Sequence, residues 1–279
     1  RPGRDGDILS GNWTGAPAFL DTQEQVISTN PELAMSEEGL VVAVWEQKTS
    51  GYSHIYSNHL RVNQTDATSN NWKGAERIDN ILSSNPESNI GNSSMPSIVI
   101  NQNDDAIVIW LKHDGQRNNI WFNRFSGSWG DQSNYLERSR LGDAMYPSII
   151  MGKNNKALAY WVQENSADSS RSLYSSFFSA SADWEAERLL ATDDELSKPV
   201  ASFDREGNAV ITWQEGLLKG DINARYYSKL TDTWDKKYSI DSWGADISLT
   251  PLFEDGRFLA VWIDDPGSSY LLKSALFSD

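Results

Sequence analysis

A pairing of one proline with one tryptophan recurs five times along the 279-residue chain. The prolines stand 65, 51, 52 and 52 residues apart, and a tryptophan follows 14 residues later in the first four units and 11 residues later in the last. A polar turn such as "GKNN" or "DREGN" lies between the two. A constant internal spacing at this period predicts a repeat architecture. The pairs are Pro31 and Trp45, Pro96 and Trp110, Pro147 and Trp161, Pro199 and Trp213, and Pro251 and Trp262.

Each unit continues in the same order after its tryptophan. A polar loop leads to a third segment rich in aromatic and β-branched residues, such as "NIWFNRF" or "DINARYY". A fourth segment opens on another tryptophan and closes on Ile or Leu, as in "WKGAERID" and "WDKKYSID". Four short strands in about 52 residues is the size of one blade of a β-propeller. Even "EAERLLATDDEL", the one stretch that could pass for a helix, is predicted from its place to be a fourth strand and loop.

The first two segments of each unit are continuous apolar runs, for example "SIVI", "AIVIW" and "AVITW". Continuous runs are typical of strands that are buried on both faces. Propeller blades pack face to face and diverge with radius, so the outer strands need bulky side chains. We therefore expect the recurring tryptophans to be core residues rather than sugar-stacking platforms.

The fifth unit ends at Asp279, directly after its third segment, and the segment "GNWTGAPAFLD" with Trp13 lies at the other end of the chain. We therefore predict an all-β fold, a five-bladed β-propeller of four-stranded antiparallel blades. The N-terminal strand completes the C-terminal blade and closes the ring, which removes exposed sheet edges. The prediction is a single domain over 1–279, with blades at about 31–80, 96–137, 147–190, 199–241, and 251–279 plus 11–21.

Composition narrows the possible partners. The formal net charge is −15, and no basic run offsets it, so we expect neither nucleic acid nor an anionic membrane surface as a partner. The chain has no cysteine, which excludes disulfides and thiolate chemistry. No apolar run approaches the roughly 20 residues that cross a bilayer. The chain begins at Arg1, which suggests a mature or shortened form, and we expect a monomer.

The residues after each second-strand tryptophan are the candidate site. The loops that leave the second strand share one end of a propeller with the loops that lead into the first strand, so these residues should gather in a collar around the axis. Converging carboxylates and amides can hold a cation or a hydroxyl-rich ligand. The alternative is a solvated rim whose acids never meet. The collar residues are Glu46, Gln47, His113, Asp114, Gln163, Glu164, Gln214, Glu215, Asp264 and Asp265.

Other signals for chemistry are weak. The three histidines have no metal-ligand spacing, and no nucleophile elbow, phosphate loop or dinucleotide motif occurs, so we predict no metal, no cofactor and no catalytic residue. The loop "ILSSNPESNIGNSSM" is longer than its equivalents and lies at the collar end; it is either a functional insertion or a tolerated one.

The pattern P-x-[IVL]-x-x-x-x-x-G-x-[AV]-x-[AV]-x-W, as in "PVASFDREGNAVITW", resembles a repeat of exported bacterial proteins in the sialidase-like propeller group. The resemblance covers nearly the whole chain and implies fold and an exported location. The sialidase Asp-box is not present, because the glycine of "SFDREG" comes one residue late and its tryptophan much later. No arginine triad or nucleophile pair can be assigned, so no catalytic residue carries over.

Two functions follow as hypotheses. The first is a non-enzymatic binding or scaffold propeller of an exported bacterial protein, with a glycan or a protein as its ligand. The alternative is a carbohydrate-active enzyme, a glycosidase or lyase, that uses collar acids across the axis, with Glu46, Glu164 and Glu215 as candidates. Near-equivalent acids in several units favour the first hypothesis, because a catalytic site normally places its two acids in different settings.

Overall fold

Apolar runs that alternate with polar turns form antiparallel hairpins throughout the molecule. The computed structural model describes residues 19–21, 26–49, 51–62, 72–80, 91–139, 142–216, 220–252, 256–264 and 270–278. Within those ranges every regular element is a β-strand, and all strand pairs are antiparallel. Across the same ranges there is no helical segment with the length and apolar character needed to cross a bilayer.

The first three repeat units each form a sheet of their own. The sheet of unit 1 contains β1 (Ile27–Met35), β2 (Leu40–Thr49), β3 (Tyr52–Arg61) and β4 (Glu76–Arg77). Unit 2 contains β5 (Ser93–Ile100), β6 (Asp105–His113), β7 (Asn118–Ser126) and β8 (Asn134–Tyr135). Unit 3 contains β9 (Ala144–Met151), β10 (Ala157–Glu164), β11 (Arg171–Ser179), β12 (Asp183–Trp184) and β13 (Arg188–Asp193), so "EAERLLATDDEL" is extended, as predicted.

Units 4 and 5 share one seven-stranded sheet. It contains β14 (Leu196–Phe203), β15 (Ala209–Glu215), β16 (Gly220–Ser228), β17 (Thr233–Trp234), β18 (Tyr238–Pro251), β19 (Arg257–Asp264) and β20 (Leu271–Ser278). The first part of β18 pairs with β16 and is the fourth strand of unit 4, whereas its second part pairs with β19 and is the first strand of unit 5. One long strand therefore joins the two units.

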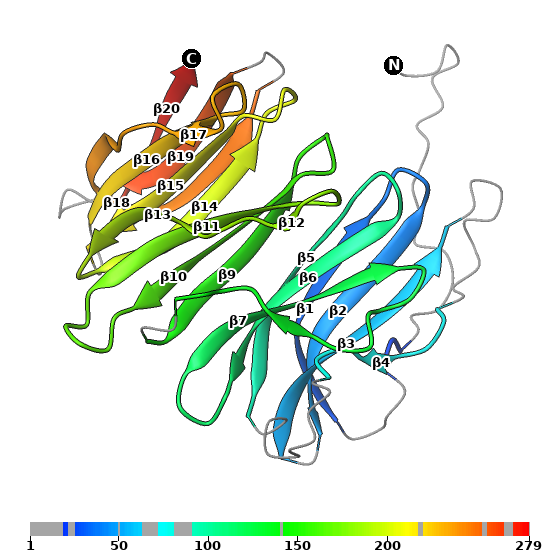
Figure 1. Ribbon diagram of the computed structural model, residues 1–279. Coiled ribbons are helices and arrows are strands. Elements are labelled where there is room, and N and C mark those ends of the chain that lie inside the picture. Colours follow the sequence, from blue (N-terminus) through cyan, green and yellow to red (C-terminus); the bar gives the residue numbers. More distant parts are fainter. Residues whose placement is uncertain are drawn as a thin grey trace, which may run out of the picture.

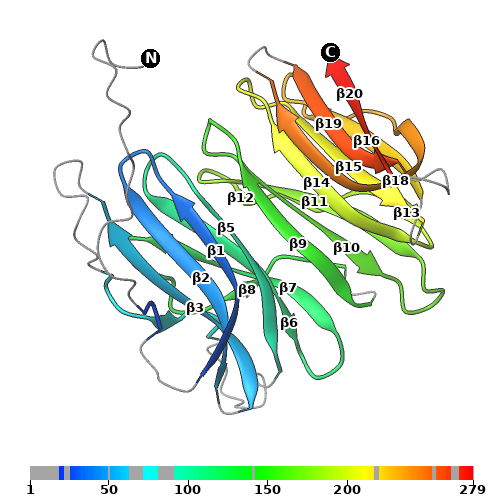
Figure 2. The ribbon, with the colours of Figure 1, turned by 180° about the vertical axis from the view of Figure 1, so that it is seen from behind.

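The sheets follow chain order along a curved row (Figures 1 and 2), with unit 1 at one end and β20 at the other. Their first strands lie side by side in the order β1, β5, β9, β14 and β18. Buried side chains fill the space between each pair of neighbouring sheets. At about 25 cal/mol per Å² of buried apolar surface, these face-to-face contacts are the main stabilising term of the fold.

The five second-strand tryptophans are core residues, as predicted. Trp110, Trp161 and Trp213 have no exposed surface, and Trp45 and Trp262 are 4% exposed. Trp110, Trp161 and Trp213 stand on strands of the middle units, which have a neighbouring sheet on each face, whereas Trp45 and Trp262 stand on the terminal units, which have one neighbouring sheet. Their apolar surface therefore stabilises the packing between units.

The proline of the fifth unit does not hold the position of its counterparts. In units 1 to 4 the proline is the fourth or fifth residue of the first strand, whereas Pro251 is the last residue of β18. The first strands of the other units carry a bulge just before the proline, and in unit 5 the bulge lies between Ala245 and Ser248. Ile247 therefore occupies the position that the proline has in the other units. The turn between the first and second strands is then longer than in those units, and not shorter as the spacing from Pro251 to Trp262 indicated. The fifth unit is a full-length repeat up to its third strand.

The predicted splice around Trp13 lies outside the described residues. Among the described strands, β20 pairs with β19 alone and is the last strand of its sheet. The first strand of unit 1 is also more exposed than that of unit 2. Nearly every position of β1 is exposed, whereas all but one of the β5 positions are buried or partly buried. The two ends of the row thus differ from its middle.

Candidate functional site

The loops that leave the second strands meet the loops that lead into the first strands, as the sequence predicts. Backbone hydrogen bonds join the two sets in units 2, 3 and 4: His113 N to Asn92 O, Glu164 N to Asp143 O, and Gly216 N to Glu195 O, each 2.9 Å long. A Cβ on Gly91 would lie 1.9 Å from the carbonyl oxygen of His113, so the close approach requires glycine. We call this end of the sheets, where the loops between the second and third strands lie, the hairpin end.

Several predicted collar residues are buried in the sheets and have hydrogen-bond partners there. Gln47, Gln163 and Asp264 are almost fully buried on their strands. The indole Nε1–H of Trp45 donates to Gln47 Oε1 at 3.1 Å, and that of Trp213 donates to Glu215 Oε1 at 3.0 Å. These acceptors satisfy indole groups that would otherwise be buried without a partner. In units 1 and 4 the residue two places after the core tryptophan thus has a packing role that spacing alone did not reveal.

One collar residue connects two sheets. Glu46 accepts hydrogen bonds from Asn30 Nδ2 at 2.6 Å and from the Met95 backbone N–H at 2.7 Å, so it links the first-strand bulges of units 1 and 2. Gln163 instead bonds within its own unit, where its Nε2 donates to the Gly142 carbonyl at 3.2 Å. Buried polar side chains with such partners are hydrogen-bonded rather than free to bind a ligand.

The remaining collar residues have local partners. Gly115 N donates to His113 Nδ1 at 3.1 Å, and the Asp114 carboxylate accepts from the backbone N–H groups of Gln116 and Arg117. Glu164 lies 3.8 Å from Arg171, across the hairpin. Glu215 and Asp264 are paired with Lys237 and Lys273 at 2.9 and 3.1 Å, and Gln214 donates to the Gly216 carbonyl at 2.8 Å. Asp265 lies outside the described residues.

The collar residues are therefore not brought together by side-chain contacts. Within the described ranges, none of them hydrogen-bonds to a collar side chain of another unit, and no group of three His, Asp or Glu side chains could hold a metal ion. The three candidate acids of the enzyme hypothesis, Glu46, Glu164 and Glu215, have three unrelated sets of partners. They stand one, three and two residues after the core tryptophan of their units, so their strand positions also differ.

The bulges of the first strands carry a feature that sequence reasoning missed. The residue before the proline, or before Ile247, has a left-handed backbone, with φ of 49° at Asn30, 53° at Met95, 52° at Tyr146 and 50° at Asp246. Such φ values are rare for residues with a large side chain. The Met95 and Tyr146 side chains remain 42% and 37% exposed. The bulge thus places one side chain per unit on the inner strand, where the adjacent first strands meet.

A buried ionic cluster between units 1 and 2 was also missed. Asp79 is fully buried and accepts hydrogen bonds from Ser93 Oγ at 2.5 Å and Lys112 Nζ at 3.3 Å, and it lies 3.2 Å from His54 Nδ1. Burial alone would raise the pKa of Asp79, but the His54 hydrogen bond and the charges of Lys112 and Arg77 hold it well below its ordinary value. The sequence feature that could have revealed this cluster is Asp79 itself, which directly follows Ile78 at the end of the fourth segment of unit 1.

An exposed tryptophan stands at the hairpin end of units 4 and 5. Trp243 belongs to neither recurring tryptophan position, and its side chain is 61% exposed. It lies in β18 at a bulge opposite β16, with a left-handed φ of 69°. The next residue must be glycine, because a Cβ on Gly244 would lie 2.4 Å from Ile222 Cγ1. Close packing of Gly244 therefore leaves the preceding indole on the surface.

Charged groups lie beside this tryptophan along the chain and across the sheet. The Asp241 carboxylate accepts from Trp262 Nε1 and from Lys273 Nζ, both at 2.9 Å, and Lys273 also contacts Asp264 at 3.1 Å. Gly244 is the cross-strand partner of Asp264. The hydrogen bond to Asp241, followed by that to Asp264, raises the pKa of Lys273. Asp241, two residues before Trp243 in the chain, is thus held in place by hydrogen bonds from Trp262 and Lys273.

Sequence comparison identifies no relatives of this chain. No protein-family model matches the sequence, and no curated protein matches it. The fold is therefore compared through solved structures.

Several solved structures are similar along most of the chain. A protein of unknown function from Dyadobacter fermentans superposes with a TM-score of 0.59 at 13% identity, covering 93% of this chain and 81% of that one. The NanB sialidase of Streptococcus pneumoniae gives 0.58 at 11% identity over 90% of this chain, which spans 59% of the sialidase chain. An α-L-arabinanase from Penicillium chrysogenum, complexed with arabinobiose, gives 0.53 at 12% identity over 89% and 76%.

These neighbours are β-propellers, and the likeness shows the fold. The chain is an all-β protein of antiparallel, mostly four-stranded sheets with the propeller arrangement. The resemblance to the sialidase-like propeller group, predicted from the repeat pattern, holds at this level of fold. At such low identity the activities of the neighbours remain properties of those proteins.

Proposed function

We propose that this chain is the propeller of an exported bacterial protein, with five repeat units in one domain, and that it binds a glycan without turning it over. Trp243 is the observation that carries the proposal. A large indole that is 61% exposed and held by a left-handed backbone offers a flat apolar face to a ligand. Backbone strain of this kind collects at functional sites. Indole rings combine an apolar face with a polar edge, which suits the ring face and hydroxyls of a sugar.

The polar surroundings support the same ligand class. Binding sites combine apolar side chains with a few fixed polar groups that orient the ligand. Asp241 and Lys273 are fixed by mutual hydrogen bonds, so their donors and acceptors need no reordering when a ligand arrives. Two of the structural neighbours act on glycans according to their names, a sialidase and an arabinanase. A glycan is therefore favoured over a protein partner.

The state of the carboxyl groups supports binding without hydrolysis. A glycosidase needs one carboxylic acid whose pKa is raised so that it can protonate the leaving group. Among the described residues, the carboxyl groups with clearly displaced pKa values are all displaced downward, by hydrogen bonds and in most cases by positive neighbours that outweigh burial. These groups are Asp79, Asp104, Asp114, Asp168, Asp232 and Asp241. The enzyme alternative has no comparable support in the described residues.

Glycan-array binding followed by calorimetry tests the proposal, with arabino-oligosaccharides and sialylated oligosaccharides as the probes. Trp243→Ala should weaken binding at least about tenfold, or about 1.4 kcal/mol. The matched control is Leu230→Ala, because Leu230 is 94% exposed on a turn away from the hairpin end and should leave binding unchanged. Absence of binding to every probe, equal binding by the Trp243 variant, or release of reducing sugar by the unmodified protein would each contradict it.

A further inference from the structure

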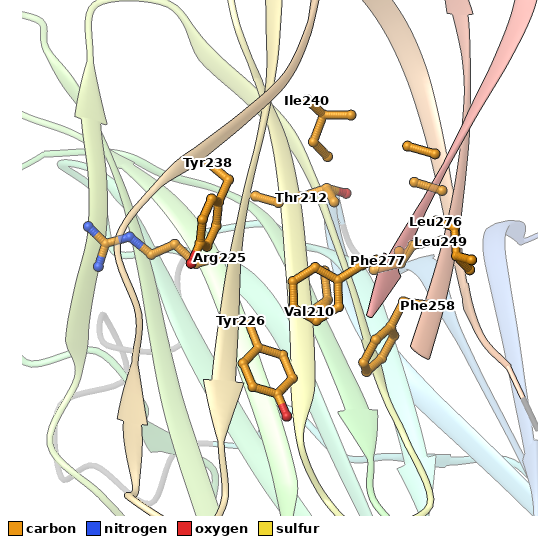
Figure 3. Close-up of a pocket in the computed structure, with 13 residues that line it drawn as sticks. Val210, Thr212, Arg225, Tyr226, Tyr238, Ile240, Leu249, Phe258, Leu276 and Phe277 are labelled. Atoms are coloured by element: carbon orange, nitrogen blue, oxygen red, sulfur yellow. The ribbon is translucent and has the colours of Figure 1, made fainter. Parts of the chain in front are cut away.

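Two hollows of the described structure differ in character. Figure 3 shows the first, a cavity of about 110 Å³ between units 4 and 5 that is lined largely by apolar side chains, among them Val210, Phe258 and Phe277. The second has a volume of about 250 Å³ and is lined by polar and apolar side chains together. It lies where turns join the first and second strands of units 1 to 3. This end of the strands, the turn end, is opposite the hairpin end.

The second hollow, which we call the turn-end pocket, is lined by equivalent positions of three consecutive units. Met35, Ile100 and Met151 are the last residues of β1, β5 and β9, and they supply its apolar lining. Met35 is 58% exposed, and the other two are partly buried. Methionine side chains are flexible and polarisable, so they adapt to apolar groups of different shape.

The charged lining comes from the turns themselves. Two residues beyond the end of each first strand, the turns contribute Glu37, Gln102 and Lys153. All three residues are exposed, and within the part of the chain that the structure describes neither Glu37 nor Lys153 forms an ion pair. The pocket therefore carries a carboxylate from unit 1 and an ammonium group from unit 3, with an amide from the unit between them.

Hydrogen bonds between units fix the turns that carry these groups. Ser36 Oγ donates to Asp104 Oδ1 at 2.5 Å, which joins the turns of units 1 and 2, and Gln102 N donates to Asn155 Oδ1 at 3.3 Å, which joins those of units 2 and 3. Asp104 and Asn155 have left-handed backbones, with φ of 63° and 58°, a conformation in which Asp and Asn are enriched. The backbone around the pocket is thus in place before a ligand arrives, which lowers the ordering cost of binding.

We propose that the turn-end pocket binds a short apolar peptide through both of its free termini. Glu37 pairs with the ammonium group of the peptide and Lys153 with its carboxylate, while Gln102 hydrogen-bonds to the peptide group between them. The apolar side chains of the peptide lie against the methionine and isoleucine lining. A neutral glycan would leave both charges unused, so this ligand differs in class from the one proposed for Trp243, and the two sites are independent.

The size of the pocket fits a dipeptide. An enclosed water needs about 10–15 Å³ of such volume, so a pocket of about 250 Å³ accommodates on the order of 15 to 25 non-hydrogen atoms. A peptide of two leucines falls in this range. Two extended residues span about 7 Å, which separates the two termini enough for one peptide to contact the long side chains of Glu37 and Lys153 at its opposite ends.

Methionine methyl NMR tests the site on the unmodified protein, because the chain has only four methionines. Met35 and Met151 line the pocket, whereas Met95 and Met145 lie near the starts of β5 and β9, toward the hairpin end. Leucyl-leucine should shift the methyl signals of the first pair with a dissociation constant of about 0.1–1 mM and leave those of the second pair in place. Absence of shifts at about 10 mM peptide, or shifts of the second pair instead, would overturn the proposal.

Two variants and two blocked peptides test the charges. Glu37→Gln should weaken leucyl-leucine binding about threefold, the size expected for an exposed ion pair, and should not change the binding of an N-acetylated peptide. Lys153→Gln should weaken leucyl-leucine binding by a similar factor and should not change that of a peptide with a C-terminal amide. Lys48→Gln, at an exposed lysine near the hairpin end, is the matched control and should leave binding unchanged. Equal binding by all variants, or equal binding of glycyl-glycine, which lacks apolar side chains, would contradict the assignment.

Discussion

The interface between units 3 and 4 and the interface between units 4 and 5 are built from equivalent strands but are packed differently. The first is a single cluster in which Trp213, Phe177 and Tyr227 are buried with Trp234 against them. The second is two small clusters on either side of a cavity. The strands themselves are not the cause, because β19 repeats the apolar run of β15. Among the described residues, Trp234 packs against the first cluster, whereas no tryptophan lines the cavity of the second interface.

This difference shows that each unit depends on its neighbours for its core. A sheet in the middle of the row is covered on both faces, whereas the first strand of unit 1 and the last strand of unit 5 are not. Stability in such arrays is a sum of unit and interface terms, and a terminal unit lacks one interface.

The largest expected effect is on the well-packed interface. Trp213→Ala should lower the free energy of unfolding by about 3–5 kcal/mol, because it removes a fully buried indole and leaves a cavity. Urea denaturation followed by circular dichroism measures the change. Trp243→Ala is the matched control and should cost less than about 1 kcal/mol, since its indole is mostly exposed. Equal costs for both would show that the recurring tryptophans are not the core.

The ionic cluster between units 1 and 2 gives the next largest effect. Asp79→Asn should lower stability at pH 7 by about 3 kcal/mol, because it leaves the buried Lys112 charge without its partner. Asp131→Asn, at an exposed carboxylate, should change stability by less than about 0.5 kcal/mol.

The same variant changes the pH dependence of stability. Asp79 has a folded-state pKa well below 3.8, so its contribution is present above pH 4 and is lost as the pH falls through the folded value. The unmodified protein should therefore lose stability in acid more steeply than the Asp79→Asn variant. Denaturation curves between pH 2 and pH 7 compare the two, and parallel curves would contradict the assignment.

The smallest effect tests the cavity between units 4 and 5. Ala275 lines it, so Ala275→Leu adds volume there. If Trp13 occupies the space, the substitution overpacks it and should destabilise by about 1 kcal/mol or more. In a Trp13→Ala background the same leucine should instead stabilise by about 1 kcal/mol. A double-mutant cycle of thermal unfolding measures this reversal of sign, and simple additivity would contradict it.

The site was harder to predict than the fold, for a physical reason. Equivalent spacing places Gln47, Gln163 and Glu215 at the same strand position, but it does not show which way a side chain turns. Gln47 and Glu215 accept from buried indole N–H groups, whereas Gln163 donates to the Gly142 carbonyl. Trp243 could have been found, because it stands outside both recurring tryptophan positions, yet its exposure depends on the packing of Gly244 against Ile222. Asp79 likewise has partners on three strands that are distant in sequence.

The sequence by itself determined the repeat, the strand content, the buried tryptophans and the meeting of two loop sets at one end. These follow from local patterns of apolar and polar residues, which the chain carries in each unit. Only the tertiary structure decided the register of the fifth unit, the use of the collar acids between sheets and the exposure of Trp243. Those features depend on contacts between units, where the identity of a neighbour matters more than the spacing along the chain.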